Sequence, residues 1–417
     1  MKTSNIRAIK YRYEEIKHLY GKKYARNTLF KKLFTQILFN PNTLIKKIFS
    51  IFKKIDINKK ESLHLTSNYQ AKKRAKVFFI VGGFLKNGGG HRNILRIAYF
   101  LEIFGYKVTL GVAQIPYGDK KIGKLVRSIY PISGSIFRFN QDNKIYDTDF
   151  VIATHWETVK LAKNQFNPES KKIYLVQDLE HLFYPMGDKY IAAENTYKDG
   201  FFHLCSGPWC CKILKEKYNA RGDYFEFPID KSVYNNHSRD NNSSRNKLLF
   251  FAKPEMDRRC FRLGIDALEI LKNQFPELEI VLFGSNHLSD FTFDFEVTNL
   301  GVMPTLEDMA DLYKSADIGI VFSTTNPSIV PYEMMACGLV VVDLDWNDSI
   351  TNYGNSDKYA ILVKPEPEKI ASRIASILSD KNSNEIEIRQ KNSLEFVERL
   401  PSEIETVKKI EKIISAL

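Results

Sequence analysis

Apolar positions along this chain follow two periods that alternate from residue 76 onward. Short runs of Val, Ile, Leu and Phe, such as residues 77–81, are separated by longer stretches in which apolar residues recur every three or four positions. Short continuous apolar runs are typical of parallel strands that are covered on both faces, and the longer spacing is typical of amphipathic helices. The alternation therefore predicts an α/β fold with parallel sheets.

The alternation occurs in two blocks that are separated by a polar stretch. The strands expected in the first block are residues 77–81, 107–112, 150–153, 173–176 and 201–204, with a helix at 93–104. The strands expected in the second block are residues 248–251, 280–283, 318–322, 340–343 and 360–363, with helices near 261–275, 306–315 and 330–337. Residues 231–246 between the blocks are rich in Asn and Ser and offer little to bury, which indicates a linker.

We therefore expect two Rossmann-like domains that face each other across a cleft, at residues 76–230 and 247–383, joined by the linker at 231–246. Residues 384–417 are helical in pattern and could cross back onto the first domain.

Residues 1–75 have a different texture, because their apolar residues alternate with lysines. Two stretches, at 29–39 and 44–55, repeat apolar residues at three and four positions and predict basic amphipathic helices. Residues 1–76 hold 20 Lys and Arg against 4 Asp and Glu, a net charge of +16, so the remainder carries −4 within the total of +12. Such helices can lie in the interface of an anionic membrane, and we expect residues 1–75 to attach the chain peripherally. The alternative is a helical segment that packs on the body and exposes its lysines.

Charge distribution and cysteine usage disfavour several classes of protein. The positive excess lies at the N-terminus, where aromatic residues do not alternate with the charges, so nucleic acid is not an expected partner. The five cysteines include no C-x-x-C pair, which argues against a disulfide framework or a structural zinc. No apolar run approaches the length of about eighteen residues that a membrane span needs, and the N-terminus lacks the apolar region of a signal peptide. We expect a cytoplasmic chain that is associated peripherally with a membrane.

A glycine-rich turn joins the first expected strand to the first expected helix. It ends in Gly88, Gly89, Gly90 and His91. Backbone N–H groups and the dipole at the start of a helix favour an anion, so the turn is a candidate phosphate or oxyanion cradle. It fits neither a Walker loop nor the G-x-G-x-x-G fingerprint, and a flexible turn without a ligand explains it equally well.

Three cations, Lys253, Arg258 and Arg259, follow the first strand of the second block. Open α/β sheets bind ligands at the carboxyl ends of their strands, where this loop lies. Cleavage at the anomeric carbon of a nucleotide sugar builds negative charge on the leaving diphosphate, which positioned Lys and Arg stabilise. The alternative is a solvated basic loop.

A second candidate loop runs from Asn326 into a short helix that carries Glu333. The N–H groups near Ser328 and Ile329 can reach phosphates, and the carboxylate of Glu333 can accept the hydroxyl groups of a ribose. Gly284, which follows another strand of the same block, is a further candidate for nucleotide binding. A surface glutamate on an amphipathic helix is the alternative for Glu333, although its apolar neighbours disfavour it.

Other polar positions have weaker signals. Asp343-Leu-Asp345 has the D-x-D spacing of metal-dependent sugar transferases, but a strand-end aspartate is the simpler explanation. His155 and His181 follow strands of the first block, so each could serve as a base or a hydroxyl ligand, or could be structural.

Taken together, the motifs resemble those of two-domain retaining glycosyltransferases of GT-B fold, and more narrowly those of bacterial rhamnosyltransferases of the WsaF type. The resemblance covers about residues 76–380. It is carried by five stretches, VQDLEHLFYPMG (176–187), AENTY (193–197), SGPW (206–209), FFAKPEMDR (250–258) and NPSIVPYEM (326–334).

The resemblance implies transfer of a deoxysugar such as rhamnose from a dTDP-sugar, or a UDP- or GDP-sugar, to a glycan or lipid-linked glycan of the bacterial surface. It implies retention of the anomeric configuration and no requirement for a metal or other cofactor. Lys253 and Arg258 would contact the diphosphate, Ser328 and its neighbours the phosphates, and Glu333 the ribose. The acceptor would lie on the first domain, near residues 88–91, His155, Asp178 and His181.

The sequence departs from the wider superfamily at several positions. Thr325 stands where a second glutamate is often found, residues 301–304 lack a lysine that often binds the donor phosphate, and Lys253 replaces an arginine. Lysine keeps the charge of arginine but loses its bidentate geometry. Two alternatives therefore stay open, a GT-B-fold binding or scaffolding protein without turnover at the membrane surface, and an epimerase that acts on the nucleotide sugar alone.

Overall fold

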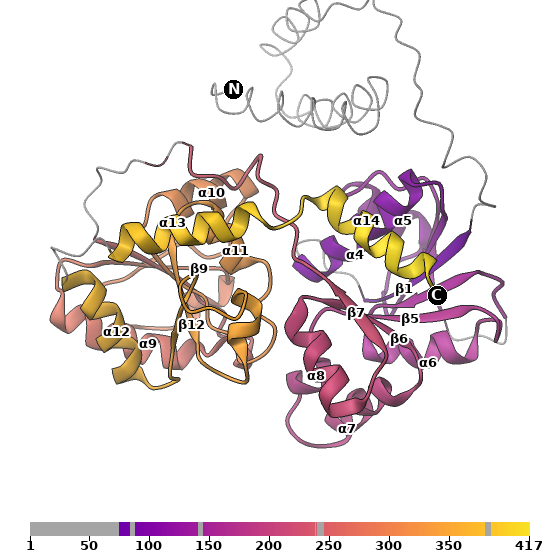
Figure 1. Ribbon diagram of the computed structural model, residues 1–417, viewed down its shortest axis with the longest axis horizontal. Helices are drawn as coiled ribbons and strands as arrows, with labels where there is room; N and C mark the ends of the chain where they lie inside the picture. Colours follow the sequence, from indigo (N-terminus) through magenta and orange to yellow (C-terminus); the bar gives the residue numbers. More distant parts are fainter. Residues whose placement is uncertain (1–74, 84–87, 141–144, 238, 240–245, 380–384) are drawn as a thin grey trace, which may run out of the picture. The chain divides into compact units, whose positions relative to one another are not determined.

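The computed structural model describes residues 75–83, 88–140, 145–237, 239, 246–379 and 385–417 (Figure 1). These residues belong to one compact unit, Arg74–Leu417. The basic amphipathic helices expected within residues 1–75 lie outside the described residues.

The first half of the unit is built on a seven-stranded parallel sheet with the order β3-β2-β1-β4-β5-β6-β7. Its strands are β1 (Lys76–Gly82), β2 (Lys107–Ala113), β3 (Ser135–Arg138), β4 (Phe150–Ala153), β5 (Lys171–Val176), β6 (Phe202–Ser206) and β7 (Gly222–Phe225). Its helices are α4 (Gly89–Ile103), α5 (Asp119–Arg127), α6 (Trp156–Asn164), α7 (Asp188–Asn195) and α8 (Pro208–Tyr218).

The second half repeats this architecture with a six-stranded parallel sheet of the order β10-β9-β8-β11-β12-β13. Its strands are β8 (Lys247–Phe251), β9 (Glu279–Phe283), β10 (Thr298–Asn299), β11 (Ile318–Ile320), β12 (Val340–Leu344) and β13 (Ile361–Val363). Its helices are α9 (Phe261–Gln274), α10 (Leu306–Lys314), α11 (Val330–Ala336) and α12 (Pro367–Ser379).

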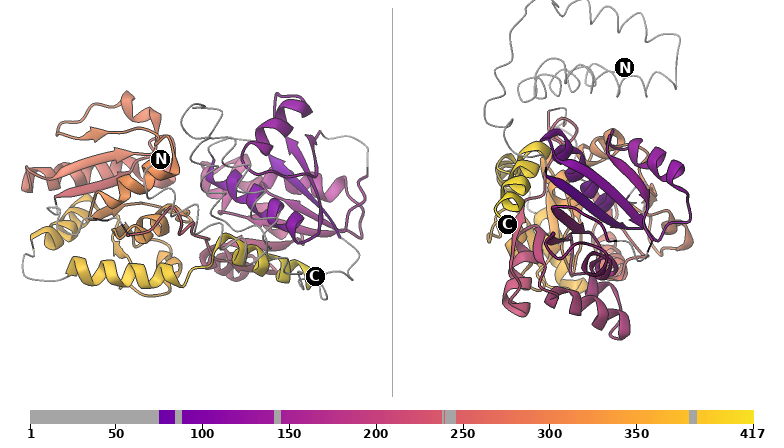
Figure 2. Two further views of the ribbon diagram at one scale, coloured as in Figure 1. Left: turned by 90° about the horizontal axis from the view of Figure 1, so that it is seen from above. Right: turned by 90° about the vertical axis from the view of Figure 1, so that its right-hand side faces the viewer.

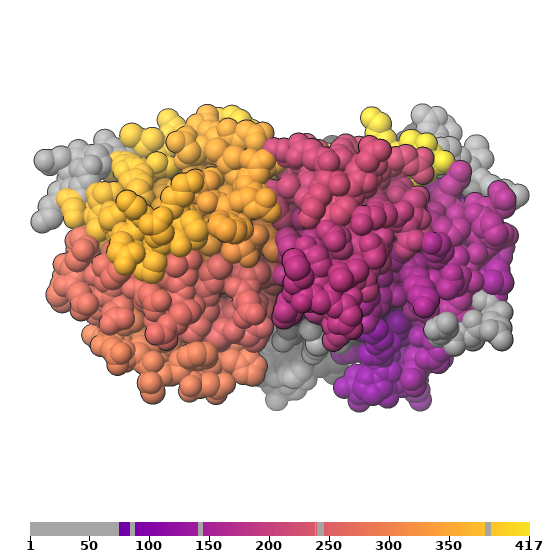
Figure 3. All heavy atoms as spheres, turned by 90° about the horizontal axis from the view of Figure 1, so that it is seen from below, coloured from indigo at the N-terminus to yellow at the C-terminus, as the bar shows by residue number. Residues whose placement is uncertain are grey.

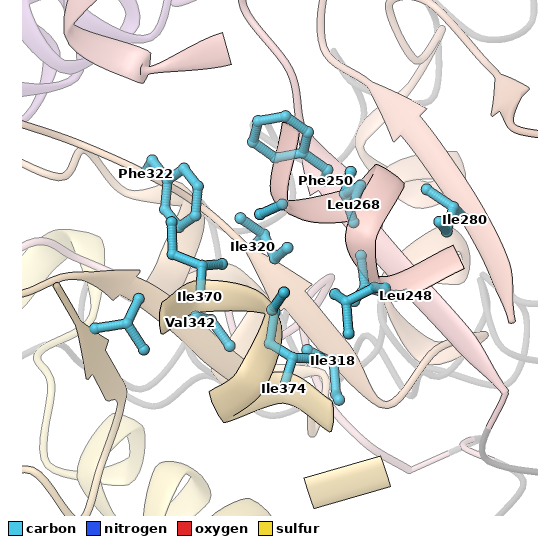
Figure 4. Packing of buried hydrophobic residues seen from close by; sticks show 14 of the residues in the cluster. Leu248, Phe250, Leu268, Ile280, Ile318, Ile320, Phe322, Val342, Ile370 and Ile374 are labelled. Carbon is cyan, nitrogen blue, oxygen red and sulfur yellow. The ribbon is translucent and has the colours of Figure 1, made fainter. Parts of the chain in front are cut away.

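The core of the second half shows why these apolar runs form strands. Phe250 of β8, Ile320 of β11 and Val342 of β12 are fully buried beneath α9 and α12 (Figure 4). A fully buried side chain of this size contributes about 1.5–3 kcal/mol relative to an exposed one. Gly264 on α9 lets that helix approach the sheet, because an added Cβ there would lie 2.3 Å from the ring of Phe250.

Two C-terminal helices link the halves. The helix α13 (Glu385–Glu398) packs on α11 of the second half, and α14 (Glu403–Ser415) packs on α4 and β7 of the first (Figures 1 and 2). An ion pair joins Arg96 of α4 to Glu403 of α14 at 3.2 Å, and Lys409 of α14 lies 2.9 Å from Glu226. The final helix therefore contacts the first sheet although it follows the second in sequence.

The halves also meet where α8 contacts the segment after β12, magenta against orange in Figure 3. The Trp209 Nε1–H group donates to the Asn347 carbonyl at 2.6 Å, and Lys212 pairs with Asp348. These contacts place residues of both halves side by side.

The structure has the two α/β halves that the hydrophobic pattern predicts, with differences at short or polar segments. The strands β3, β7 and β10 were not expected, because they are short and lie at or near sheet edges, where they leave little continuous apolar signal. The helix α4 begins at Gly89, four residues earlier than expected, since glycines gave no helical pattern. Tyr234, inside the expected linker, is buried against the second core.

Candidate functional site

The strand order of each sheet reverses once, and these two points define where a ligand can enter. In the first sheet the chain leaves β1 in one direction to β2 and in the other to β4, and in the second sheet the same reversal lies between β8 and β11. Open α/β sheets bind ligands outside the carboxyl ends of the strands at such points. His155 lies two residues after the end of β4, and Lys253 lies two residues after the end of β8.

Two histidines meet at the reversal point of the first sheet. The ring of His155 lies against Gly82 at the end of β1, where an added Cβ would be 2.7 Å from His155 Cβ. Burial lowers the pKa of both His91 and His155 below the usual value for histidine, and the charge of His91 lowers the pKa of His155 further. Both rings are therefore neutral near pH 7 and able to accept a proton or a hydrogen bond.

A buried carboxyl group, Glu180, supports this pair. Glu180 Oε2 accepts hydrogen bonds from the Trp156 N–H at 2.6 Å and from the Tyr174 hydroxyl at 3.0 Å, and it lies 3.9 Å from His155 Nε2. Burial raises the pKa of Glu180 to about 8, although both hydrogen bonds oppose this rise. The carboxyl thus anchors the first residue of α6, directly after His155.

The glycine-rich turn lies beside these groups. Gly88 caps α4 without a side-chain hydrogen bond, and Gly89, Gly90 and His91 form the first turn of the helix. The Gly90 carbonyl accepts from Gln177 Nε2 at 3.2 Å, which ties this turn to the end of β5. An uncapped first turn presents backbone donors, as an anion or a polar acceptor requires.

Cationic groups occupy the corresponding edge of the second half. Arg258 has its guanidinium 4.4 Å from the centre of the Phe183 ring and its Nε 3.5 Å from Asp178 Oδ2. Lys253 forms an ion pair with Glu255 at 3.2 Å, and Glu255 accepts from the Ser285 hydroxyl. Both cations are partly exposed, so a ligand can reach them.

Arg259, the third cation of the loop, has a different environment. It is buried, and its Nη1 donates to the Pro327 carbonyl at 2.8 Å. Burial lowers its pKa to about 10, and the neighbouring positive charge of Arg258 acts in the same direction. The side chain of Arg259 thus holds the loop after β11.

The loop after β11 contains an unusual backbone conformation. Ser328 has a backbone φ of +78°, which residues other than glycine rarely adopt. Its buried Oγ has no hydrogen-bond partner among the described residues. Strain of this kind, about 1–3 kcal/mol, persists where the surroundings enforce it and concentrates at functional sites. Ile329 is the N-cap of α11.

Two further residues of this region, Gly284 and Asn326, are constrained by their backbone conformation or by their hydrogen bonds. Gly284 has a φ of +111°, and an added Cβ would lie 2.7 Å from the Phe251 ring, so no other residue fits without displacing that ring. Asn326 Nδ2 donates to the carbonyls of Gln177 and Ser206, each at 2.8 Å. The amide of Asn326 therefore faces the first half.

Glu333 lies on α11, half-buried, with positive groups of the first half nearby. Burial raises its pKa to about 8, whereas the charges of Arg92 and Arg96 and a hydrogen bond with Tyr234 act in the opposite direction. The carboxyl group of Glu333 in the second half thus lies close to cationic groups of the first half.

Other expected site residues lie apart from this arrangement. His181 is enclosed by tyrosines, with its ring nitrogens 3.5 Å from the hydroxyls of Tyr197 and Tyr218, and burial lowers its pKa to about 4. Asp343 accepts from Tyr353 at 2.8 Å, and Asp345 instead pairs with Lys364. The two aspartates of the D-x-D spacing thus have separate structural partners.

The described part of the chain contains neither a candidate metal-binding cluster nor a candidate membrane-spanning helix. No group of three or more His, Cys, Asp or Glu side chains is arranged there to hold a metal ion. Among the described helices, none combines the length and apolarity that crossing a bilayer requires.

Sequence reasoning missed Glu180, although it stands between Asp178 and His181 in a stretch that it singled out. In the sequence, Glu180 is one acidic residue among other polar residues, and nothing there marks it as buried. The partners that bury it, Trp156 and Tyr174, come from a different helix and strand.

Two facing parallel-sheet halves, with a C-terminal helix returning to the first, define the GT-B class of fold. The chain is similar to Anabaena HepE in complex with UDP-glucose, with a TM-score of 0.64 and 16% identity over 82% of this chain and 100% of HepE. It is similar to sucrose-phosphate synthase from Thermosynechococcus elongatus, with a TM-score of 0.61 and 13% identity over 82% of this chain and 99% of the synthase. At such identities the likeness concerns the fold, and it confirms the predicted GT-B architecture.

Within this class, the chain belongs to the WsaF family of glycosyltransferases. Residues 246–375 match the model of the WsaF C-terminal domain, and residues 123–203 match that of the N-terminal domain. The O-antigen biosynthesis protein RfbC of Myxococcus xanthus is 30% identical over 238 residues, or 56% of this chain. The matched region spans only 18% of the length of RfbC.

Proposed function

We propose that this chain transfers a sugar from a nucleotide-diphosphate donor to a glycan acceptor. The observation that carries the proposal is the difference between the two edges. Cations and the strained loop at Ser328 gather at the reversal point of the second sheet, and neutral histidines gather at that of the first. A transferase needs both kinds of site, one for the leaving diphosphate and one for the attacking hydroxyl group.

The donor we propose is a dTDP-deoxysugar, with dTDP-rhamnose as the first to test, and transfer with retention that needs no metal. Membership of the WsaF family supports this choice, and the name of the RfbC relative supports an acceptor among bacterial surface polysaccharides. HepE binds UDP-glucose within a similar fold, which supports a nucleotide sugar as the donor class.

In this proposal Lys253 and Arg258 stabilise the negative charge that develops on the diphosphate as the bond to the anomeric carbon breaks. Backbone groups near Ser328 and Ile329, together with Gly284, hold the phosphates. The carboxyl group of Glu333 accepts hydrogen bonds from the ribose hydroxyl groups. His155 and the N-terminal turn of α4, Gly88 to His91, orient the acceptor hydroxyl group.

The experiment is a panel of nucleotide sugars offered to the full chain with a glycan acceptor, with products identified by mass spectrometry. dTDP-rhamnose should give a product heavier by one deoxyhexose, and dTDP alone should raise the melting temperature. Lys253→Ala should remove that shift, whereas Arg262→Ala, an exposed arginine on α9, should keep it. Absence of any shift with dTDP, UDP or GDP would sink the proposal.

The same panel distinguishes the alternatives. An epimerase would convert the nucleotide sugar without an acceptor, whereas a transferase should show little turnover until glycan is added. A scaffolding protein would bind nucleotide with neither transfer nor slow hydrolysis of the donor.

We further propose that residues 1–75 attach the enzyme to an anionic membrane surface. Their net positive charge and amphipathic pattern support this location, which would bring the site near a lipid-linked acceptor. Removing residues 1–70 should release the protein from vesicles that contain phosphatidylglycerol. Equal binding of the full and shortened chains would contradict this role.

A further inference from the structure

Two segments that are distant in sequence meet at the carboxyl ends of strands from the two sheets. One follows β5 in the first half and contains Gln177 and Asp178. The other is the loop after β11 in the second half. Asp178 Oδ2 accepts from the Thr325 hydroxyl at 2.8 Å, and Asp178 Oδ1 accepts from the Asn326 N–H at 3.0 Å. The side chain of Asn326 returns two hydrogen bonds to carbonyls of the first half.

This contact is buried, and its carboxylate accepts three hydrogen bonds. Asp178, Thr325 and Asn326 are exposed by only 7%, 5% and 2%. Besides the donors from the second half, Oδ1 accepts from the Leu179 N–H at 2.8 Å, and Arg258 Nε lies 3.5 Å from Oδ2. A carboxylate offers about four acceptor positions, and three of them are occupied by these hydrogen bonds, while Arg258 pairs with Oδ2 electrostatically.

The loop that Asp178 holds also carries the groups proposed to bind phosphate. Its Pro327 carbonyl accepts from Arg259, and the next residue, Ser328, has the strained backbone. Arg258 is itself positioned between Asp178 and the Phe183 ring, both from the first half. Asp178 is thus the one carboxylate of the first half that contacts both this loop and Arg258, alongside the carbonyls of Gln177 and Ser206 that hold Asn326.

We propose that Asp178 is a positioning residue for the donor site. By binding Thr325, Asn326 and Arg258, it aligns the loop 323–328 and the arginine with the diphosphate of the nucleotide sugar. The inference rests on the proposed function, and it gives Asp178 a role different from contact with the acceptor.

The test uses Thr325→Val in the full chain, because this change removes the hydroxyl group that donates to Asp178 and keeps the size of the side chain. Its matched control is Thr148→Val, another buried threonine, whose hydroxyl donates to the Lys76 carbonyl at 2.9 Å, at the opposite end of the first sheet. Binding of dTDP-rhamnose without acceptor is measured by calorimetry, and steady-state kinetics give KM for donor and for acceptor.

Thr325→Val should weaken donor binding by about tenfold, in line with loss of one buried hydrogen bond to a charged group. Thr148→Val should leave donor binding within about twofold of the wild type. Asp178→Asn, which keeps the shape but loses the charge that faces Arg258, should weaken it further. The KM for acceptor should stay unchanged in Thr325→Val.

Three results would overturn the inference. Equal donor affinities for Thr325→Val and Thr148→Val would show that the contact does not position the site. A rise of KM for acceptor in Asp178→Asn with unchanged donor binding would instead make Asp178 an acceptor ligand. Failure of the wild-type chain to bind any nucleotide diphosphate would remove the proposed function itself, and the inference with it. Should Asp178→Asn not fold, Thr325→Val alone decides.

Discussion

The reversal points of the two sheets have the same backbone plan but different chemistry. Each has a turn or loop after its first strand, and each has a carboxyl group whose pKa burial raises to about 8: the buried Glu180 in the first half and the half-buried Glu333 in the second. The first half surrounds its carboxyl with aromatic residues and neutral histidines. The second half has Lys253 and Arg258 at the corresponding edge, and Glu333 has Arg92 of the first half nearby.

This difference indicates that the two halves share one architecture but carry side chains suited to different chemistry. A parallel sheet places the loops at the carboxyl ends of its strands on one edge, whatever their sequence. The sheet therefore determines where the site lies, and the residues of the loops determine its chemistry. Neutral rings suit a hydroxyl group that must lose a proton, and cations suit a diphosphate that gains charge. Substitutions of these side chains test whether the two edges differ in this way.

The largest effect is expected from Arg258→Ala. Loss of one positioned cation at a developing charge should lower kcat/KM with dTDP-rhamnose by about 10²–10³-fold. Arg262→Ala, whose side chain is exposed and pairs with Asp266, should change kcat/KM by less than about twofold. Similar losses in both variants would mean that the cations of the second edge have no specific role.

The pH dependence of stability tests the buried carboxyl of the first half. Because the pKa of Glu180 is raised to about 8 in the folded chain, the native state keeps a proton that the unfolded state has lost between about pH 4.5 and pH 8. Stability from this group therefore falls as pH rises through that window. The unfolding free energy, measured in urea, should decrease from pH 5 to pH 8 in the wild type. In Glu180→Gln this decrease should be smaller by a few kcal/mol.

Glu385→Gln is the control of opposite sign. Hydrogen bonds from Arg373 and Arg389 lower the pKa of Glu385 to about 2, so its stabilising contribution is complete above about pH 4.5 and is lost as pH falls toward 2. It should not alter the slope between pH 5 and pH 8. An unchanged slope in Glu180→Gln would show that Glu180 ionises normally in the folded chain.

A third prediction concerns the contact of β1 with His155. In Gly82→Ala the new Cβ must displace His155, which should cost about 1–3 kcal/mol of stability and lower activity. Gly118→Ala, where an added Cβ would meet nothing within 4 Å, should cost less than about 1 kcal/mol. Both are measured by urea unfolding, and equal costs would mean that the packing of His155 on Gly82 is not tight.

The smallest effect is expected at the returning helix. Lys409→Ala removes the pair of α14 with Glu226, in which both side chains are about one-third exposed. A pair of this exposure contributes about 0–1 kcal/mol, and less at high salt. Urea unfolding at low and at 1 M salt should show a difference between wild type and variant only at low salt. A larger, salt-independent loss would indicate that the stem of Lys409 packs on Tyr224.

The features of this protein that depend on local pattern can be predicted from its amino-acid sequence. Continuous apolar runs and helical spacing predicted the two α/β halves, since burial on both faces of a sheet requires such runs. The cations after β8 and the motif at residues 326–334 were visible because loop residues at strand ends need no knowledge of distant partners. The short strands β3, β7 and β10 had no such signal.

The partners of the polar residues, in contrast, follow from how the strands and helices pack. His155 and His181 looked alike in sequence, but one lies at a reversal point beside Glu180 and the other is enclosed by tyrosines. Lys253 and Arg259 looked equally able to bind a ligand, yet Arg259 is buried on the Pro327 carbonyl. Asp178 meets Thr325 across 147 residues of sequence. Pairing at that separation is set by how two sheets pack, which no local pattern encodes.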